Sequence, residues 1–255
     1  MRILVTNDDG IHAPGLAVLE EIARQFSDDV WVCAPSDNQT GAGHSLTLSM
    51  PVRLRKHGER RFSVTGTPTD AVSIGLKTVM DSPPDLILSG VNAGANLGDD
   101  ITYSGTVSAA MEGALAGIKS IAMSQVMKQE RPAWDDRFEA ARKWGPKAVQ
   151  PLLDTTFEPR TLISINYPCC AADDVKGMRV VRQGFHDYDR GSVIEARDPR
   201  GQRYYWFGLD AIEHTPDHGT DLEAIAEGCV SITPLQLELT HHGSLAGLAR
   251  SFEDK

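Results

Sequence analysis

Two adjacent carboxylates near the amino terminus are the first residues with a chemistry of their own. Asp8 and Asp9 follow the apolar run of residues 3–5 and precede Gly10. Like charges this close are costly to leave unpaired, and a bound divalent cation relieves the crowding. Asp and Gly are also favoured in surface turns. The segment alone leaves a metal site and an ordinary turn equally open.

Two polar loops offer further ligands. Residues 35–45 carry hydroxyl and amide groups, although this stretch taken alone is typical of a flexible polar loop. Residues 90–100 space three glycines four apart and include Asn92 and Asn96, whose amide oxygens can bind a cation. This loop lacks the G-x-G-x-x-G pattern and the acidic residue that would bind a ribose, which disfavours a nicotinamide dehydrogenase.

The tripeptide Ser104, Gly105 and Thr106 opens an Ala-rich stretch of helical character. A helix start of this kind presents backbone N–H groups and hydroxyls suited to a phosphate, and simple N-capping explains the same residues. Together the candidates are hard oxygen donors without a thiolate, and the nearby imidazoles are His12 and His44. This set favours Mg²⁺ or Mn²⁺ over zinc. Such a cation polarises a phosphoryl oxygen and activates a bound water.

The elements that must position these residues alternate between short β-rich runs and helical patterns. That alternation predicts a parallel sheet with helices on both faces. Ligands of such sheets bind outside the carboxyl ends of the strands, so the candidate segments should meet at one edge. We expect strands at 2–6, 29–34, 85–89, 120–124, 161–166 and 178–182, a hairpin over 52–65, a loop over 91–104, and helices at 67–80, 106–118 and 134–153.

Two local patterns predict further details of the fold, a helix start and an arm. Thr67, Pro68 and Asp70 form a helix start, with Thr67 as the cap and Asp70 three residues later. Residues 190–207 are polar and aromatic without a period that would bury them against their own domain. This second segment is predicted to be an arm that packs on something else.

Composition narrows the class of protein. The chain has 255 residues and a formal net charge of -10, which argues against a nucleic-acid polymer or an anionic membrane as the main partner. Its first apolar run is too short for a signal peptide or a membrane span. The four cysteines form no C-x-x-C pair, so a reducing compartment, and hence a cytoplasmic location, is expected.

Specific sequence strings then point to a family. They are, in chain order, ILVTNDDGIHAPG, GHSLT, GTPTD, SGVNAGANLGDDITYSGTVSAAMEG, DPRG, GTD and GCVSITPL. The chain resembles the SurE survival protein family of metal-dependent 5'-nucleotidases over essentially its whole length. The resemblance implies a Rossmann-like, doubly wound α/β fold. It also implies hydrolysis of nucleoside 5'-monophosphates, with side activity on 3'-monophosphates and short polyphosphate.

The resemblance also implies roles for particular residues. One divalent ion per subunit, Mg²⁺ or Mn²⁺, would be held by Asp8, Asp9, Thr40 and Asn92. The two aspartates would be the catalytic residues, and the phosphate would be bound by Asn96, Ser104, Gly105 and Thr106. Thr40 departs from the serine usual in the family, and its added methyl stiffens χ1 and could retune metal affinity. For His44, a supporting or purely structural role is as open as a catalytic one.

The implied assembly is a homodimer or tetramer in which a C-terminal hairpin arm is exchanged between subunits. On this basis we expect a catalytic core over 1–184 and a C-terminal region over 185–255, with the arm at about 190–207 and a closing strand and helix. Two other functions stay open. An aspartyl-phosphate-type phosphatase needs Asp-x-Asp, whereas Asp8 and Asp9 are adjacent, and a non-catalytic nucleotide-binding stress module would turn nothing over.

Overall fold

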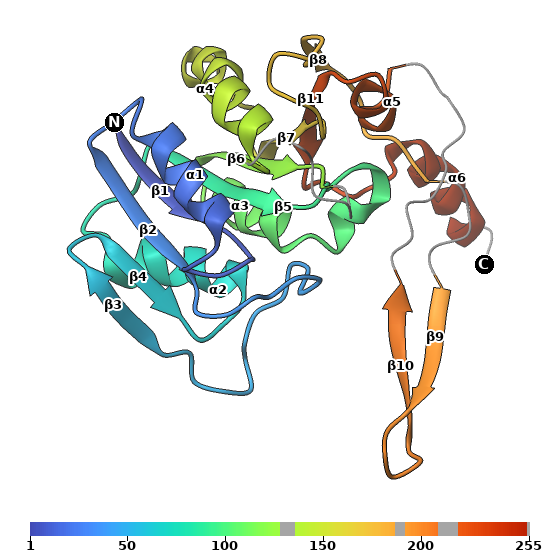
Figure 1. The fold of residues 1–255 in the computed structure, drawn as a ribbon. Helices are drawn as coiled ribbons and strands as arrows, with labels where there is room; N and C mark the ends of the chain where they lie inside the picture. The colour runs from blue at the N-terminus through green and yellow to red at the C-terminus, as the bar shows by residue number, and fades with distance from the viewer. Residues whose placement is uncertain (128–135, 187–191, 209–218, 254–255) are drawn as a thin grey trace.

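The computed structural model describes residues 1–127, 136–186, 192–208 and 219–253. A large mixed sheet with helices on both faces forms the body of the protein (Figure 1). Its strands are β1 (Arg2–Thr6), β2 (Asp29–Pro35), β3 (Leu54–Gly58), β4 (Arg61–Val64), β5 (Leu86–Ala93), β6 (Lys119–Gln125), β7 (Thr161–Tyr167), β8 (Met178–Val180) and β11 (Val230–Gln236). Their order across the sheet is β3-β4-β2-β1-β5-β6-β7-β11-β8.

Most neighbouring strands of the sheet are parallel. The exceptions are β3 with β4, which form the expected hairpin, and β7 with β11. The α/β class with a mostly parallel sheet is therefore confirmed. From β1 the chain moves outward to β2 and β4, and then returns to β5, β6 and β7 on the other side. The order reverses at β1, and such a switch point leaves a crevice at the carboxyl end of that strand.

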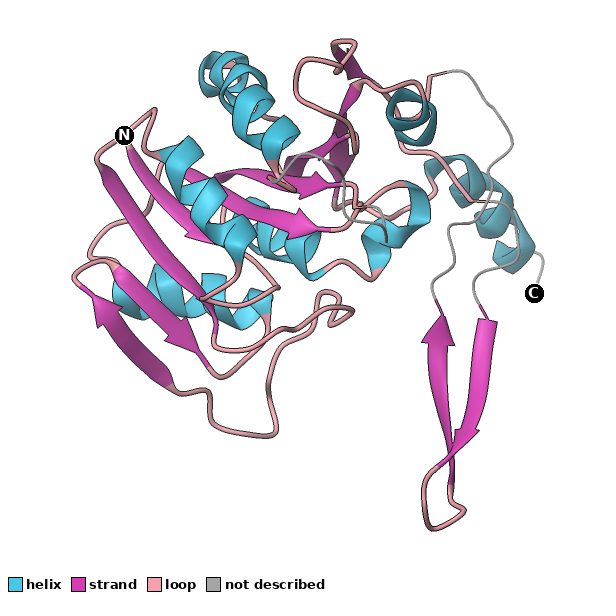
Figure 2. Ribbon diagram, viewed as in Figure 1, coloured by secondary structure: helices cyan, strands magenta, loops and turns pink. Residues whose placement is uncertain are grey.

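Helices lie along both faces of the sheet, as Figure 2 shows. They are α1 (Pro14–Ala23), α2 (Pro68–Ile74), α3 (Gly105–Leu115), α4 (Glu139–Asp154), α5 (Asp221–Ala226) and α6 (His242–Glu253), with a π-helix η1 (Gly75–Val79) and a 3₁₀ helix η2 (Gly98–Thr102). Helices α1 and α4 share one hydrophobic cluster with the sheet, whereas α2 and α3 contribute to clusters on the opposite face.

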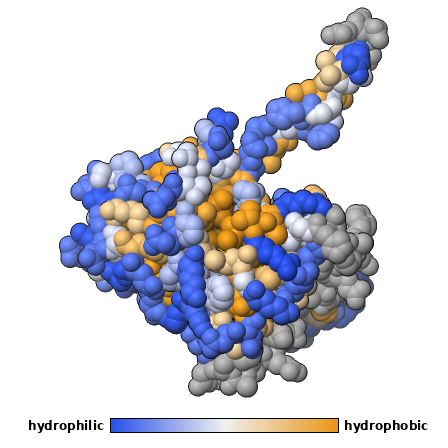
Figure 3. All heavy atoms as spheres, turned by 90° about the horizontal axis from the view of Figure 1, so that it is seen from above, coloured by the Kyte–Doolittle hydropathy of each residue, from blue (hydrophilic) through white to orange (hydrophobic). Residues whose placement is uncertain are grey.

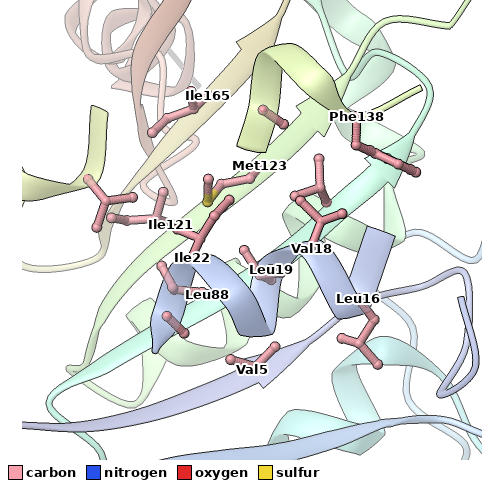
Figure 4. Packing of buried hydrophobic residues seen from close by; sticks show 14 of the residues in the cluster. Val5, Leu16, Val18, Leu19, Ile22, Leu88, Ile121, Met123, Phe138 and Ile165 are labelled. Atoms are coloured by element: carbon pink, nitrogen blue, oxygen red, sulfur yellow. The ribbon is translucent and has the colours of Figure 1, made fainter. Parts of the chain in front are cut away.

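The face beneath α1 and α4 is aliphatic. Val5, Leu88 and Ile121 project from neighbouring strands, and Leu19 and Ile22 of α1 pack onto them (Figure 4). All five side chains are completely buried. Burying a side chain of this size stabilises the fold by about 1.5–3 kcal/mol.

The face beneath α3 combines a row of small side chains with the aliphatic Ile87, Leu162 and Leu235. One row in register across the sheet consists of Thr6, Ser89, Ala122, Ser164 and Thr233. Helix α3 lies close to this face because its inner positions are also small. A Cβ added at Gly113 would lie 2.3 Å from the Ser120 hydroxyl oxygen. The close packing brings the first turn of α3 near the carboxyl end of β1.

Of three local predictions, the structure confirms the helix cap at Thr67 and corrects the helix and the loop that follow it in the chain. The cap at Thr67 is confirmed, because its hydroxyl accepts the Asp70 N–H and the Asp70 carboxylate accepts the Thr67 N–H. The helix expected to run to residue 80 changes type, since Met80 N–H donates to the carbonyl of Gly75 and closes a π-turn. The loop expected over 91–104 is shorter, because β5 resumes pairing with β6 at Asn92 and η2 follows.

The arm expected near residues 190–207 contains an antiparallel hairpin. Strands β9 (Ser192–Arg197) and β10 (Arg203–Gly208) pair only with each other among the described residues, and the hairpin stands away from the body (Figures 1 and 3). Strand β11, later in the chain, lies inside the main sheet. The proposed division into 1–184 and 185–255 stays a prediction. Of the described helices, none is long and apolar enough to cross a membrane.

Candidate functional site

The two aspartates leave β1 at the switch point in a tight turn. Asn7 fixes this turn, because its side-chain amide donates to the carbonyl of Gly10 (3.0 Å) and its oxygen accepts the Gly10 N–H (3.2 Å). Gly10 has φ +103°, a conformation that favours glycine, and an added Cβ would lie 3.2 Å from the carbonyl carbon of Asp37. This turn sets the direction of the Asp8 and Asp9 side chains. A turn and a metal site at these residues are therefore compatible interpretations.

Asp8 is only 3% exposed and lies against the start of α3. The Thr106 hydroxyl donates to its carboxylate. Burial raises the pKa of Asp8 to about 6, the neighbouring Asp9 charge adds to the rise, and the Thr106 bond opposes it. A Cβ at Gly105 would lie 2.7 Å from the Asp8 Cβ, so only glycine allows the helix to begin here. An ionised carboxylate is thus held in a poorly hydrated position.

Asp9 joins the site to the end of β5. Its carboxylate accepts the backbone N–H of Ala93 (3.1 Å), and burial raises its pKa. Asn92 precedes Ala93 and uses its amide nitrogen to donate to the carbonyl of Gly94 (3.0 Å). The structure therefore brings Asp9 and the Asn92 segment together, as the strand-end rule predicts.

The loop after β2 bridges the two halves of the crevice. The Gln39 N–H donates to the Asp8 carbonyl (2.8 Å), and the Gly43 N–H donates to the Tyr103 carbonyl (3.2 Å). Thr40 follows Gln39, so its backbone comes near Asp8. Thr40 is exposed, and its backbone N–H donates to the side-chain oxygen of Asn38 (2.8 Å). The loop position suits a ligand, and the role of Thr40 stays a prediction.

His44 lies on the same loop but is held by a different element. Its Nε2 lies 3.4 Å from a carboxylate oxygen of Glu112, two turns into α3. The Ser73 hydroxyl donates to the other oxygen of that carboxylate (2.6 Å). His44 thus ties the loop to α2 and α3, and neither aspartate is its hydrogen-bond partner in the described part of the chain.

The predicted phosphate residues divide into two groups. Ser104 caps α3, because its hydroxyl oxygen accepts the Val107 N–H (3.0 Å). The N–H groups of Gly105 and Thr106 begin the helix and have no carbonyl partner within it. Asn96 lies toward β6 and β7 instead, where its amide nitrogen donates to the Ser124 hydroxyl (2.8 Å).

Sequence reasoning missed two residues that hold Asn96. Ser124 and Asn166 are both 1% exposed and bond to Asn96 directly. Each lies near the carboxyl end of a strand that the sequence did predict. Polar residues at the carboxyl ends of strands are the signal that indicated Asp8 and Asp9, and the same signal marks Ser124 and Asn166.

The arrangement favours an oxygen-bound cation over a site rich in imidazole or thiolate. No group of three or more His, Cys, Asp and Glu that could hold a metal occurs within residues 1–127, 136–186, 192–208 and 219–253. A metal here would rest on two carboxylates, completed by neutral oxygens. That donor set matches the preference of Mg²⁺ and Mn²⁺.

Fold and site together define a class: an α/β protein with two adjacent carboxylates at the switch point of a mostly parallel sheet, one of them buried against a helix start. Residues 3–190 match the model of the family described as "Survival protein SurE". The chain belongs to the SurE family.

The chain is similar to other proteins of this family over nearly its whole length. The chain is 68% identical over 254 residues to "5'-nucleotidase SurE" of Erythrobacter litoralis, covering 99% of this chain and 100% of that protein. It is 57% identical over 247 residues to "5'-nucleotidase SurE" of Rhizorhabdus wittichii, covering 96% and 97%. The crystal structure of the Sure protein from Aquifex aeolicus superposes with a TM-score of 0.84 at 37% identity, covering 98% of this chain and 99% of that one.

Proposed function

We propose that this chain is a metal-dependent 5'-nucleotidase, a phosphoric monoester hydrolase that converts nucleoside 5'-monophosphates to nucleoside and phosphate. Weaker activity on 3'-monophosphates and short polyphosphate is part of the proposal. The name shared by its similar proteins supports the reaction class. The single observation that carries it is the buried Asp8 carboxylate against the first turn of α3.

The residues present fit a hard divalent cation. Asp8 and Asp9 are adjacent, and burial raises the pKa of both, so their ionised forms need a positive partner. Asp8, Asp9, Asn92 and Thr40 would hold one Mg²⁺ or Mn²⁺. When bound, such an ion supplies Lewis-acid stabilisation of phosphoryl oxygens and an acidified water.

The remaining residues would bind the phosphate. The N–H of Gly105 and the positive end of α3 attract an anion, and Ser104 and Asn96 add a hydroxyl and an amide. Thr106 would contact the phosphate by sharing the N–H and hydroxyl that it also directs at Asp8. These groups would stabilise charge on the equatorial oxygens while water attacks in line. Neither aspartate would then act as a nucleophile, because both are engaged as ligands.

A substrate panel tests the function. AMP, GMP, 3'-AMP and a short polyphosphate are offered with Mg²⁺, Mn²⁺ or Ca²⁺, and with EDTA alone. Multiple turnover of the 5'-monophosphates with metal, and none with EDTA, is the expected result. Binding of AMP without turnover under every condition would favour the non-catalytic nucleotide-binding module.

The stereochemistry at phosphorus tests the mechanism. Direct attack by water gives inorganic phosphate with inverted configuration from a chirally labelled ester. The rival aspartyl-phosphate route predicts retention and an acyl phosphate on Asp8 or Asp9 that borohydride can trap. The adjacent spacing of the two aspartates favours inversion.

Assembly through the hairpin is also part of the proposal. The hairpin exposes large apolar side chains, among them Trp206 (64%) and Phe207 (82%), which a monomer would leave in water. Deletion of residues 190–207 should give a smaller species with a lower melting temperature. An unchanged oligomer size in light scattering would contradict an exchanged arm. A cytoplasmic location is proposed as well, since all four cysteines are free thiols.

A further inference from the structure

Asn96 is held by a side-chain clasp from β7. The Asn96 N–H donates to the amide oxygen of Asn166 (2.9 Å), and the amide nitrogen of Asn166 donates to the Asn96 carbonyl (3.1 Å). The side chain of Asn166 therefore pairs with the Asn96 backbone as a neighbouring strand would. The Asn96 amide nitrogen is already bonded to Ser124, so both the backbone and the side chain of Asn96 are fixed.

A second anchor lies two residues further along the same loop. The buried Asp221 carboxylate accepts the N–H groups of Gly98 (2.9 Å) and Gly184 (2.8 Å). The side chain of Gln183 donates to the Gly98 carbonyl (3.0 Å). The loop after β5 is thus tied to parts of the chain about 70 to 120 residues later, and the GTD string of the sequence gains a structural role.

We infer that Asn166 is the positioning residue of this site: it holds the Asn96 backbone and so fixes where the Asn96 amide, the proposed phosphate contact, lies, with Asp221 steadying the same loop. The inference rests on the phosphate role proposed above for Asn96. Asn166 itself makes no contact with the substrate. Its contribution is orientation, because without the clasp the loop that carries Asn96 would be free to move from its place beside β6 and β7.

Two buried amides allow a matched test. Gln125 is 2% exposed and, like Asn166, exchanges side-chain bonds with backbone: it donates to the Pro168 carbonyl (2.8 Å) and accepts the Ala141 N–H (3.0 Å). Its side chain serves the α4 side of the edge, whereas its backbone carbonyl accepts the Gly94 N–H, a bond that an alanine at this position keeps. Asn166→Ala and Gln125→Ala therefore remove similar bonds, with different consequences expected for the site.

The first readout is kinetic. In the full-length protein with Mn²⁺, Asn166→Ala should lower kcat/KM for AMP by about 10²-fold, since small displacements of a binding group have effects of this size. The inhibition constant of inorganic phosphate should rise by the same factor as KM. Gln125→Ala should change either value by no more than about twofold. Asn166→Asp keeps the acceptor but loses the donor, and should not restore activity.

The second readout needs no turnover. Amide hydrogen exchange over residues 94–98 should quicken in Asn166→Ala and stay at the parent rate in Gln125→Ala. Unchanged exchange, or equal kinetic losses in the two alanine variants, would overturn the inference. If the parent protein shows no turnover of AMP, the proposed function fails by itself, and the exchange measurement still decides whether the clasp holds the loop.

Discussion

Ile165 and Ser164 are neighbours on β7 that belong to opposite faces of the same sheet. Ile165 is buried in the aliphatic layer of α1 and α4 (Figure 4). Ser164 lies in register with Ala122 on the α3 face, and its hydroxyl has no hydrogen-bond partner among the described residues. One face gains stability from large apolar side chains. The other face also buries Ile87, Leu162 and Leu235, but its central row is small, and this row lets α3 approach.

The close approach of α3 has a functional consequence. Large side chains in the row of small residues would lift the helix from the sheet and separate Gly105 and Thr106 from Asp8. The comparison therefore predicts that substitutions on the aliphatic face change stability, whereas substitutions along the first turn of α3 change the site.

The largest effect is expected at the carboxylate pair. The double change Asp8→Asn and Asp9→Asn should lower kcat/KM for AMP by roughly 10³-fold or more, because the charge that holds the cation is removed. The metal-free melting temperature should not fall, since two crowded carboxylates are relieved. Turnover close to that of the parent in a folded double variant would remove both residues from the mechanism.

Truncation on the aliphatic face should be costly in a different way. Ile165→Ala should destabilise the fold by about 3 kcal/mol, the usual range for a buried aliphatic residue. Below the melting transition, kcat/KM should stay near the parent value. Denaturant unfolding measures the first quantity, and Leu48→Ala, at a position 88% exposed, is the control that should change neither.

Alanine substitutions at two glycines of α3 distinguish an effect on helix packing from an effect on the geometry of the site. Gly105→Ala would place a Cβ 2.7 Å from the Asp8 Cβ, and should lower kcat/KM by about 10²-fold. Gly113→Ala is equally crowded, against Ser120 and Ile87, but lies two turns away. It should cost about 1–3 kcal/mol of stability with a smaller kinetic loss. The reverse ranking of the two kinetic effects would show that α3 does not need to touch Asp8.

Thr40 should give a smaller effect. If its hydroxyl binds the cation, Thr40→Val, which keeps the shape, should weaken apparent metal affinity by roughly tenfold. Thr40→Ser should keep or improve it. Titration of activity with Mn²⁺ compares the three proteins, and equal affinities for Val and Thr would exclude Thr40 as a ligand.

The smallest effect is expected at Ser164. Removing a buried hydroxyl that lacks a partner costs no hydrogen bond, so Ser164→Ala should change the free energy of unfolding by less than about 1 kcal/mol, or stabilise the fold. A larger loss in denaturant unfolding would mean that a buried water satisfies this hydroxyl.

Local sequence patterns by themselves determined most strands and helices up to residue 182, and the strand-end position of the carboxylates. The cap at Thr67 and the placement of Asp8 and Asp9 after β1 depend on residues close in the chain, whose spacing is visible in the sequence. The hairpin over residues 54–64 is of the same kind. These features follow from backbone hydrogen bonds and turn preferences that act over a few residues.

Only the tertiary structure decided which distant residues complete the site. The Thr106 bond to Asp8, the glycine contact at Gly105 and the clasp of Asn166 on Asn96 join residues 70 or more positions apart. Their geometry depends on strand order and on how closely α3 packs against the sheet. No local pattern encodes that distance, because it is set by the combined packing of side chains from several strands.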